Sequence, residues 1–244
     1  EGEELQVKVP GFSGGDKTNL ELPAVQSDLL SLLKKSGKPV VLVLMNGSAL
    51  SINRENKELD AIVEAWYGGE QAGHAVAGVL FGDYNPAGRL PITFYKSIND
   101  IPAFDDYRMA GKTYRYCHKP VLYPFGYGLS YTRFQYSNLQ LSSALLRDSI
   151  VVKLDVTNTG SRNGDEVVQL YIQQPGSHAI KELKGFQRVN IKAGMTRRVS
   201  ITIFAKDLEH YYKQHDGMEL LPGRVKVMVG ASSADIRLTG SFII

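Results

Sequence analysis

The stretch SIVVKLDVTNTGSRNGDEVVQLYIQQP, residues 149–175, contains two runs in which apolar and polar residues alternate. A period of two residues is typical of a β-strand with one buried and one solvated face. Between the two runs lies NTGSRNG, whose Asn and Gly residues favour tight turns. The stretch therefore predicts two neighbouring strands and an all-β fold for this part of the chain.

The same rhythm continues towards the C-terminus. The further short strands that we expect are LKGFQRVNI (183–191), MTRRVSITIF (195–204), ELLPGRVKVMVGAS (219–232) and RLTGSFII (237–244). Turn sequences IKAG, HDG and LPG lie in this part of the chain. Strands at this spacing are typical of an antiparallel β-sandwich of about a hundred residues. We assign residues 136–244 to this domain.

Upstream, helical patterns alternate with buried strands. The sequence predicts a helix at 22–36, a strand at 40–45, a short helix running into a strand at 59–67, a helix at 70–82 and a last strand at 89–95. The apolar run VVLVLM at 40–45 has no polar alternation, as expected where both faces of a parallel sheet are covered. The pattern predicts an α/β domain at 1–135, with a mostly parallel sheet, flanking helices and a long aromatic-rich loop that begins near residue 96.

Composition excludes several classes of function. Lysine and arginine residues are scattered and the net charge is +3, so we expect no nucleic-acid partner. No apolar stretch approaches the roughly 18 residues of a membrane span, so we expect no membrane partner. The single cysteine, Cys117, excludes an internal disulfide. The five histidines lack the spacing of a metal site, so no metal and no cofactor is predicted.

Four strings, in this order, carry a family resemblance: AWYGGEQAGHAVAGVLFGDYNPAGRLPITF (65–94), YPFGYGLSYTRF (123–134), VTNTGSRNGDEVVQLYI (156–172) and ELKGFQRV (182–189). Together they resemble the C-terminal half of glycoside hydrolase family 3, the β-glucosidases and β-xylosidases. Members of that family carry a (β/α)8 barrel, then an α/β sandwich domain, and often a fibronectin type III-like domain. The resemblance implies that this chain is the second domain, entered part-way, followed by the third. The barrel with the nucleophilic aspartate would then be a separate portion of the same protein.

The resemblance also implies a catalytic glutamate near the start of the chain. In many family members the acid/base glutamate precedes a Gly-Asp-Arg or Asp-Arg motif and a Leu-Pro pair. Here GEE at 2–4 precedes GGDK at 14–17 and LELP at 20–23, with Lys17 in place of the usual arginine. Glu3 aligns best, Glu1 is a close second, and Glu4 is third. A retaining glycosidase needs two carboxyl groups about 5–5.5 Å apart, and its proton donor needs a raised pKa.

Aromatic side chains are candidates for substrate binding. Sugar rings present apolar C–H faces, which suit exposed aromatic rings flanked by hydrogen-bonding groups. Tyr107, Tyr114 and Trp66 could serve in this way. The string YPFGYGLSY, in contrast, has the spacing of a packed connection between domains.

The expected function is exo-hydrolysis of terminal non-reducing β-D-glucosyl residues by a retaining mechanism. The expected partners are a β-linked gluco- or xylo-oligosaccharide substrate and the N-terminal barrel of the same protein, without which this chain is expected to be inactive. The alternatives are a β-xylosidase or glucan exo-hydrolase of the same family, or a non-catalytic carbohydrate-binding or assembly module. A homodimer is compatible with the sequence, and a periplasmic or secreted location is expected.

Overall fold

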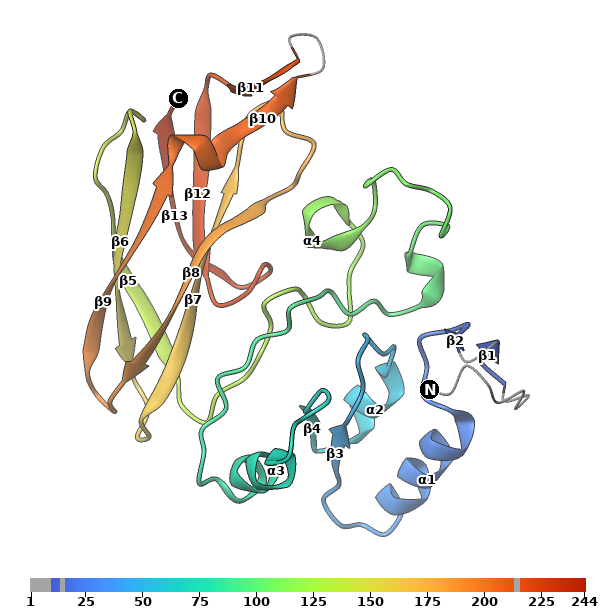
Figure 1. Ribbon diagram of the computed structural model, residues 1–244. Coiled ribbons are helices and arrows are strands. Elements are labelled where there is room, and N and C mark those ends of the chain that lie inside the picture. The colour runs from blue at the N-terminus through green and yellow to red at the C-terminus, as the bar shows by residue number, and fades with distance from the viewer. Residues whose placement is uncertain (1–9, 14–15, 213–215) are drawn as a thin grey trace. The chain divides into compact units, whose positions relative to one another are not determined.

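The computed structural model describes residues 10–13, 16–212 and 216–244, and the chain forms two compact units (Figure 1). The first unit contains the described residues up to Phe81, together with 93–108 and 118–123. The second unit contains 82–92, 109–117 and the described residues from Pro124 onward. Two short segments that precede the β-sandwich in the sequence therefore pack with it. None of the described helices is long and apolar enough to cross a membrane.

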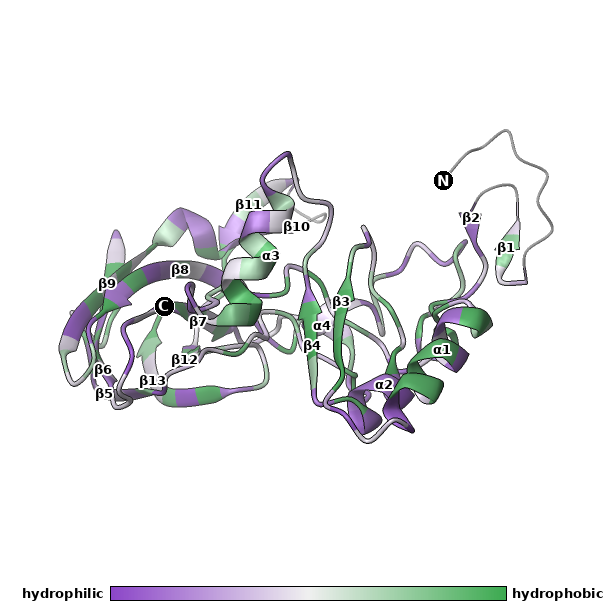
Figure 2. Cartoon of the chain, turned by 90° about the horizontal axis from the view of Figure 1, so that it is seen from below, coloured by the Kyte–Doolittle hydropathy of each residue, from purple (hydrophilic) through white to green (hydrophobic). Residues whose placement is uncertain are grey.

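The first unit has an α/β arrangement. Its elements are β1 (Phe12–Ser13), β2 (Asp16–Lys17), α1 (Ala24–Lys34), β3 (Val41–Leu44), α2 (Asn53–Glu58), β4 (Ala61–Glu64), α3 (Ala72–Phe81) and the 3₁₀ helix η1 (Ile98–Asp100). β3 and β4 pair in parallel, with Val41 opposite Ala61, and β3 is coloured as hydrophobic in Figure 2. A small core forms around Leu44, Leu50 and Ile52. The α/β class, the helices expected at 22–36 and 70–82 and the strand expected at 40–45 are thus confirmed.

Two expectations for residues 1–135 were wrong. The helix expected within 59–67 lies earlier, as α2, because Leu59 is already extended (φ −89°, ψ 154°) and the chain then enters β4. The strand expected at 89–95 is absent among the described residues, where Phe94 forms an isolated bridge with Tyr123. Pro91 lies in this segment and has no N–H group to donate to a ladder.

The second unit is an antiparallel β-sandwich, as expected. Its elements are α4 (Thr113–Tyr116), β5 (Phe134–Leu141), β6 (Ser149–Asn158), β7 (Gly164–Gln173), β8 (Glu182–Ile191), β9 (Thr196–Phe204), the 3₁₀ helix η2 (Ala205–Leu208), β10 (Glu209–Tyr212), β11 (Gly217–Leu220), β12 (Arg224–Gly230) and β13 (Ile236–Ile243). One sheet has the order β13-β12-β7-β8 and another has the order β5-β6-β9, while β10 and β11 form a hairpin. The sequence did not predict β5 or β10 as strands.

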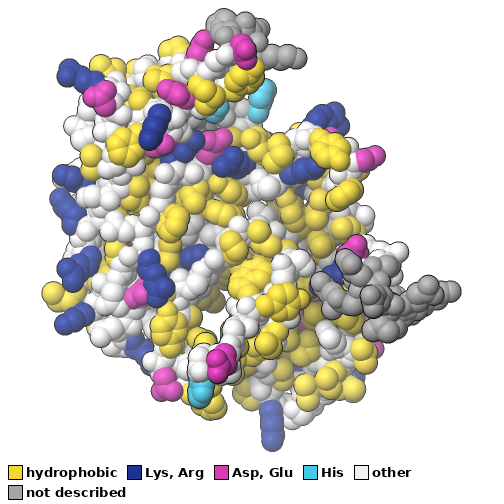
Figure 3. Space-filling model, in the orientation of Figure 1, with side chains coloured by type: hydrophobic (Ala, Val, Ile, Leu, Met, Phe, Trp, Pro, Cys, Tyr) yellow, Lys and Arg dark blue, Asp and Glu magenta, His cyan; other side chains and the backbone are white. Residues whose placement is uncertain are grey.

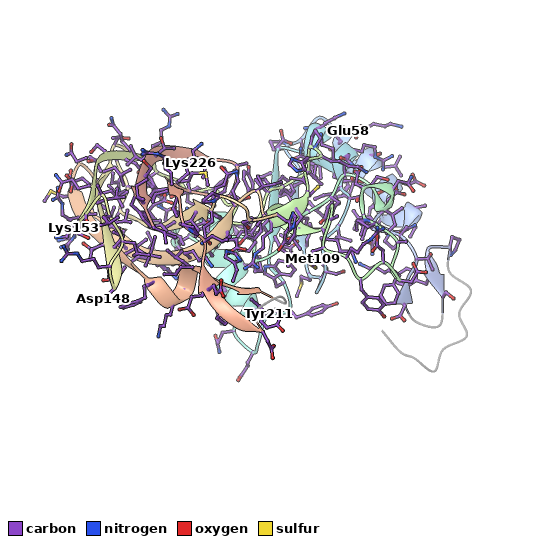
Figure 4. All side chains as sticks on the ribbon, turned by 90° about the horizontal axis from the view of Figure 1, so that it is seen from above. Glu58, Met109, Asp148, Lys153, Tyr211 and Lys226 are labelled. Carbon is purple, nitrogen blue, oxygen red and sulfur yellow. The ribbon has the colours of Figure 1, made fainter. Side chains whose placement is uncertain are left out.

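Alternation along β6 explains the core of the sandwich. Ile150, Val152, Leu154 and Val156 are fully buried in one hydrophobic cluster. Lys153, between two of them, is exposed and lies at the outer surface in Figure 4. Figure 3 shows a row of Lys and Arg side chains along the same side of the sandwich. Because side chains alternate between the two faces of a strand, β6 has one buried apolar face and one charged face.

The charged face of β6 and β9 leads to a pH-dependent expectation. Asp155 accepts hydrogen bonds from Arg198 Nε and Nη2, at 2.7 and 2.8 Å, and from Asn138 Nδ2 at 2.8 Å. The bonds from Arg198, followed by that from Asn138, lower the pKa of Asp155 from 3.8 to about 2. Since the pKa is lowered on folding, the carboxylate stabilises the fold fully above pH 3.8, and this contribution is lost as the pH falls through about 2.

Asp155→Asn is therefore expected to lower the free energy of unfolding at pH 7, by no more than about 1 kcal/mol because the pair is partly solvated. The difference in the free energy of unfolding between the variant and the unmodified chain should become smaller below pH 4. Thermal unfolding at a series of pH values would measure it. Asp148→Asn is the matched control, since the Asp148 side chain is exposed and has no hydrogen-bond partner among the described residues. This account would be contradicted if Asp155→Asn and the unmodified chain differed in free energy of unfolding by the same amount from pH 7 to pH 2.5.

Candidate functional site

Polar side chains gather where the two parallel strands of the first unit end. Asn46 follows β3 by two residues, Glu64 is the last residue of β4, and Trp66 comes two residues later. Leu44 lies opposite Glu64 in the register, so the three residues share the carboxyl edge of the pair. Open parallel sheets bind their ligands beyond this edge. We call Asn46, Glu64 and Trp66 the β3–β4 edge and treat it as the candidate site of the first unit.

Asn46 presents an unpaired oxygen at this edge. Its Nδ2 donates to the Ser48 carbonyl oxygen at 2.6 Å and, over a longer distance of 3.4 Å, to Glu64 Oε2. The residue is buried, and its Oδ1 has no hydrogen-bond partner among the described residues. An unsatisfied buried acceptor costs free energy. A ligand hydroxyl that reached Oδ1 would remove this cost.

Glu64 is a half-buried carboxyl group beside Asn46. Burial raises its pKa above the ordinary value, while hydrogen bonds from the backbone N–H of Trp66 and from the Asn46 side chain act in the opposite direction. The backbone N–H of Trp66 donates to Glu64 Oε1 at 3.2 Å. A carboxyl group with a raised pKa keeps its proton to higher pH, so it can donate to a ligand as well as accept from one.

Trp66 is held in an uncommon backbone conformation. Its φ of 54° lies in the left-handed region, where a bulky side chain is rare and the backbone is strained. The indole ring packs edge-to-face against Phe94, with the ring centroids 6.2 Å apart. Because Trp66 is only half-buried, part of its surface remains open to solvent. The edge therefore combines a carboxyl group, an amide oxygen and an aromatic ring, which are the groups that suit a saccharide.

The other candidates from the sequence have different surroundings. Glu1, Glu3 and Glu4 lie outside the described residues. Tyr107, in the first unit, is 89% exposed.

Tyr114 belongs to α4 in the second unit. Its ring stacks on Phe125 at 4.3 Å, and its hydroxyl oxygen accepts the Leu183 N–H at 3.0 Å. One face of its ring and its hydroxyl oxygen are therefore engaged within the sandwich unit.

Sequence reasoning named Trp66 but missed Asn46 and Glu64. A signal was present, because each of the two follows closely on an apolar run that becomes a parallel strand. Among the described residues, no group of three or more His, Cys, Asp or Glu side chains could hold a metal ion.

Comparisons with known proteins match most of the chain. The "Glycosyl hydrolase family 3 C-terminal domain" matches residues 1–131, and the "Fibronectin type III-like domain" matches residues 166–233. The chain is 45% identical to a xylan 1,4-beta-xylosidase of Xylanibacter ruminicola over 96% of its length. It is 41% identical to a periplasmic beta-glucosidase of Salmonella typhimurium over 98% of its length. The chain spans 27% and 34% of these two relatives, respectively.

Solved structures of proteins named as glucosidases or glucohydrolases also match the chain. Beta-D-glucoside glucohydrolase of Trichoderma reesei superimposes with a TM-score of 0.85 at 27% identity, over 95% of this chain and 37% of that one. Beta-glucosidase 3B of Thermotoga neapolitana, solved in complex with α-D-glucose, superimposes with a TM-score of 0.82 at 30% identity, over 94% of this chain and 36% of that one. The family match covers more than half of the chain, and the fold agrees with it. The chain belongs to glycoside hydrolase family 3.

Proposed function

We propose that the protein containing this chain hydrolyses terminal non-reducing β-D-glucosyl residues with retention of configuration. The observation that carries the proposal is that enzymes named as β-glucosidases and β-xylosidases match almost the whole chain. In this proposal Glu3, or alternatively Glu1, protonates the departing oxygen and then deprotonates the incoming water. Trp66 and Tyr107 would contribute to the wall of the sugar cleft, with Tyr114 as a third, more enclosed candidate.

A second candidate substrate is a β-xyloside. The xylan 1,4-beta-xylosidase of Xylanibacter ruminicola is more similar to the chain than the periplasmic beta-glucosidase is, which favours this alternative. The two sugars differ in one hydroxymethyl group, and a pocket discriminates such a difference by roughly 10–200-fold at most. Both substrates therefore belong in the same assay.

An N-terminal portion of the protein is part of the proposal, since it would bring the nucleophilic aspartate. The helix α1 supports a further partner for this unit, because none of its residues is buried, although Val25, Leu29, Leu32 and Leu33 are apolar. Val25 is 76% exposed and Leu32 is 62% exposed. A parallel sheet with covered faces normally has more than the two strands β3 and β4. Further chain would cover this apolar surface.

Export to the periplasm or the medium is the location that we propose. It is supported by the name of the Salmonella typhimurium relative, a periplasmic beta-glucosidase. Signal-sequence cleavage and cell fractionation of the native protein would test the location separately from the activity.

The test is an assay of the full-length protein and of the 244-residue chain on p-nitrophenyl β-D-glucopyranoside and β-D-xylopyranoside. We expect p-nitrophenol release from the full-length protein, with the β-anomer of the sugar formed first in proton NMR, and no release from the chain alone. Release by the chain alone would overturn the role given to the N-terminal portion. A folded full-length protein that cleaves neither substrate but retains saccharide binding would replace the proposal with that of a binding module.

A further inference from the structure

A pocket of about 480 Å³ lies within the second unit. Four parts of the chain line it: Arg89, residues from Tyr127 to Phe134, Glu166 on β7, and residues from Ala231 to Arg237. Its volume lies in the range of roughly 300–1,000 Å³ that is usual for small-molecule sites. We propose that this pocket, called here the sandwich pocket, binds one neutral polyhydroxylated ring such as a single pyranose. It contains none of the residues of the β3–β4 edge.

Glu166 supplies a fixed acceptor. The residue is 2% exposed, and its Oε1 accepts from Arg89 Nη2, the Tyr136 hydroxyl and the Val167 N–H, each at 3.2 Å. Its Oε2 has no hydrogen-bond donor among the described residues, although Glu166 lines the pocket. A carboxylate oxygen takes up about two donors. The arrangement around Oε1 therefore fixes the carboxylate and leaves Oε2 for a ligand.

Ser232 and Arg133 supply donors. Ser232 Oγ accepts the N–H groups of Ala234 and Asp235 at 3.3 and 2.9 Å, and its own hydroxyl hydrogen has no acceptor among the described residues. Arg133 is exposed, and its guanidinium has no partner in the part of the chain that the structure describes. The pocket thus offers one acceptor and two donors to a ligand. Hydroxyl groups match this set because each both donates and accepts.

The charges in the sandwich pocket favour a neutral ligand. Arg89 pairs with Glu166 at 3.2 Å, and Arg237 pairs with Asp235 at 2.8 Å, so four of the five charged lining residues neutralise one another. An anion would face the carboxylates of Glu166 and Asp235, and a cation would face three arginines. A neutral ring avoids both repulsions.

Apolar lining residues complete the match. Tyr127, Leu129 and Phe134 belong to the same lining as the polar groups, and Leu129 is 70% exposed. Aromatic and aliphatic surface beside a few hydrogen-bonding groups suits the C–H face of a sugar ring.

A purely structural role of the Arg89–Glu166 pair explains the hydrogen bonds that Glu166 Oε1 accepts. It does not explain why three groups at one pocket, Glu166 Oε2, the hydroxyl hydrogen of Ser232 and the Arg133 guanidinium, have no partner among the described residues.

The test is a titration of the ¹⁵N-labelled 244-residue chain with D-glucose and D-xylose, followed through the amide signals of Gly128, Arg133 and Ser232. We expect saturable shifts with a Kd on the order of millimolar, as the size of a monosaccharide implies. Arg133→Ala should weaken binding about fivefold, since it removes one hydrogen bond to a ligand hydroxyl. Ser232→Ala should weaken it by a similar factor. Arg197→Ala is the matched control, because Arg197 is an exposed arginine outside the pocket, and it should leave the Kd unchanged.

Three outcomes would overturn the proposal: no shift of these amides at 100 mM sugar, shifts that Arg133→Ala and Ser232→Ala leave unaltered, or tighter binding of inorganic phosphate or methylammonium than of either sugar. The readout is binding at named amides, not hydrolysis. The proposal therefore stands or fails independently of the glycosidase activity.

Discussion

Glu3→Gln in the full-length protein is expected to lower kcat for p-nitrophenyl β-D-glucopyranoside by about 10²–10⁴-fold, the contribution of a general acid/base group. Glutamine has nearly the same shape as glutamate but has no acidic proton for the departing oxygen and cannot deprotonate water. For a 2,4-dinitrophenyl glycoside the loss in kcat/KM should be much smaller, because kcat/KM covers only the steps up to departure of the leaving group, and this group departs without protonation. Steady-state kinetics with the two substrates would measure both effects.

The matched control is Glu1→Gln, which makes the same change two residues away. It is expected to retain most of the activity. Added azide should restore turnover of the Glu3→Gln variant on the 2,4-dinitrophenyl substrate, because azide attacks the anomeric carbon without a general base and yields the β-glycosyl azide. If Glu1→Gln lost more activity than Glu3→Gln, the acid/base role would be assigned to Glu1 instead. Full activity in both variants would remove the acid/base role from these glutamates.

Elements whose signal lies within their own residues could be predicted from the sequence. The strand β6 is an example, since its alternating apolar residues fill the sandwich core and Lys153 between them stays exposed. The apolar run that becomes β3 is another. In both, the residues that form the element are also the ones that bury it.

Elements that depend on distant contacts could not be predicted in this way. The helix α2 has the polar sequence NRENKE, and its one buried residue, Glu55, accepts the Ser27 hydroxyl at 2.7 Å from a helix 28 positions away. Tyr114 was a reasonable candidate for stacking on a sugar, but its ring lies on Phe125 instead. Its environment is set by a loop and a strand that no local pattern brings together.

The same limit applies to the candidate sites. Asn46 and Glu64 are 18 residues apart and meet because β3 and β4 pair in parallel. Arg89 and Glu166 are 77 residues apart, in strings that carry the family resemblance but show no sign of pairing with each other. Residue types at the ends of strands suggest where such groups lie. The partner of each group follows from the tertiary fold.

Arg89→Leu is expected to destabilise the second unit by about 3–5 kcal/mol, the usual cost of removing one partner from a buried ion pair. The Arg89 and Glu166 side chains are 8% and 3% exposed, so Arg89→Leu would leave the buried Glu166 side chain without its ion-pair partner. The Tyr136 hydroxyl would remain as a neutral donor, since burial and then the nearby charge of Glu166 raise the pKa of Tyr136. Urea unfolding at pH 7 would measure the loss.

The double variant Arg89→Leu/Glu166→Leu separates the charge effect from packing. Replacing both partners by apolar groups removes the uncompensated charge, so the double variant should be more stable than Arg89→Leu alone. Arg188→Leu is the matched control, because Arg188 pairs with Asp165 at 2.6 Å in a partly exposed setting, where loss of the pair should change stability by about 1 kcal/mol or less. A loss in Arg89→Leu as small as in Arg188→Leu would mean that the Arg89–Glu166 pair is solvated. Glu166 would then not be the fixed buried carboxylate that the sandwich pocket requires.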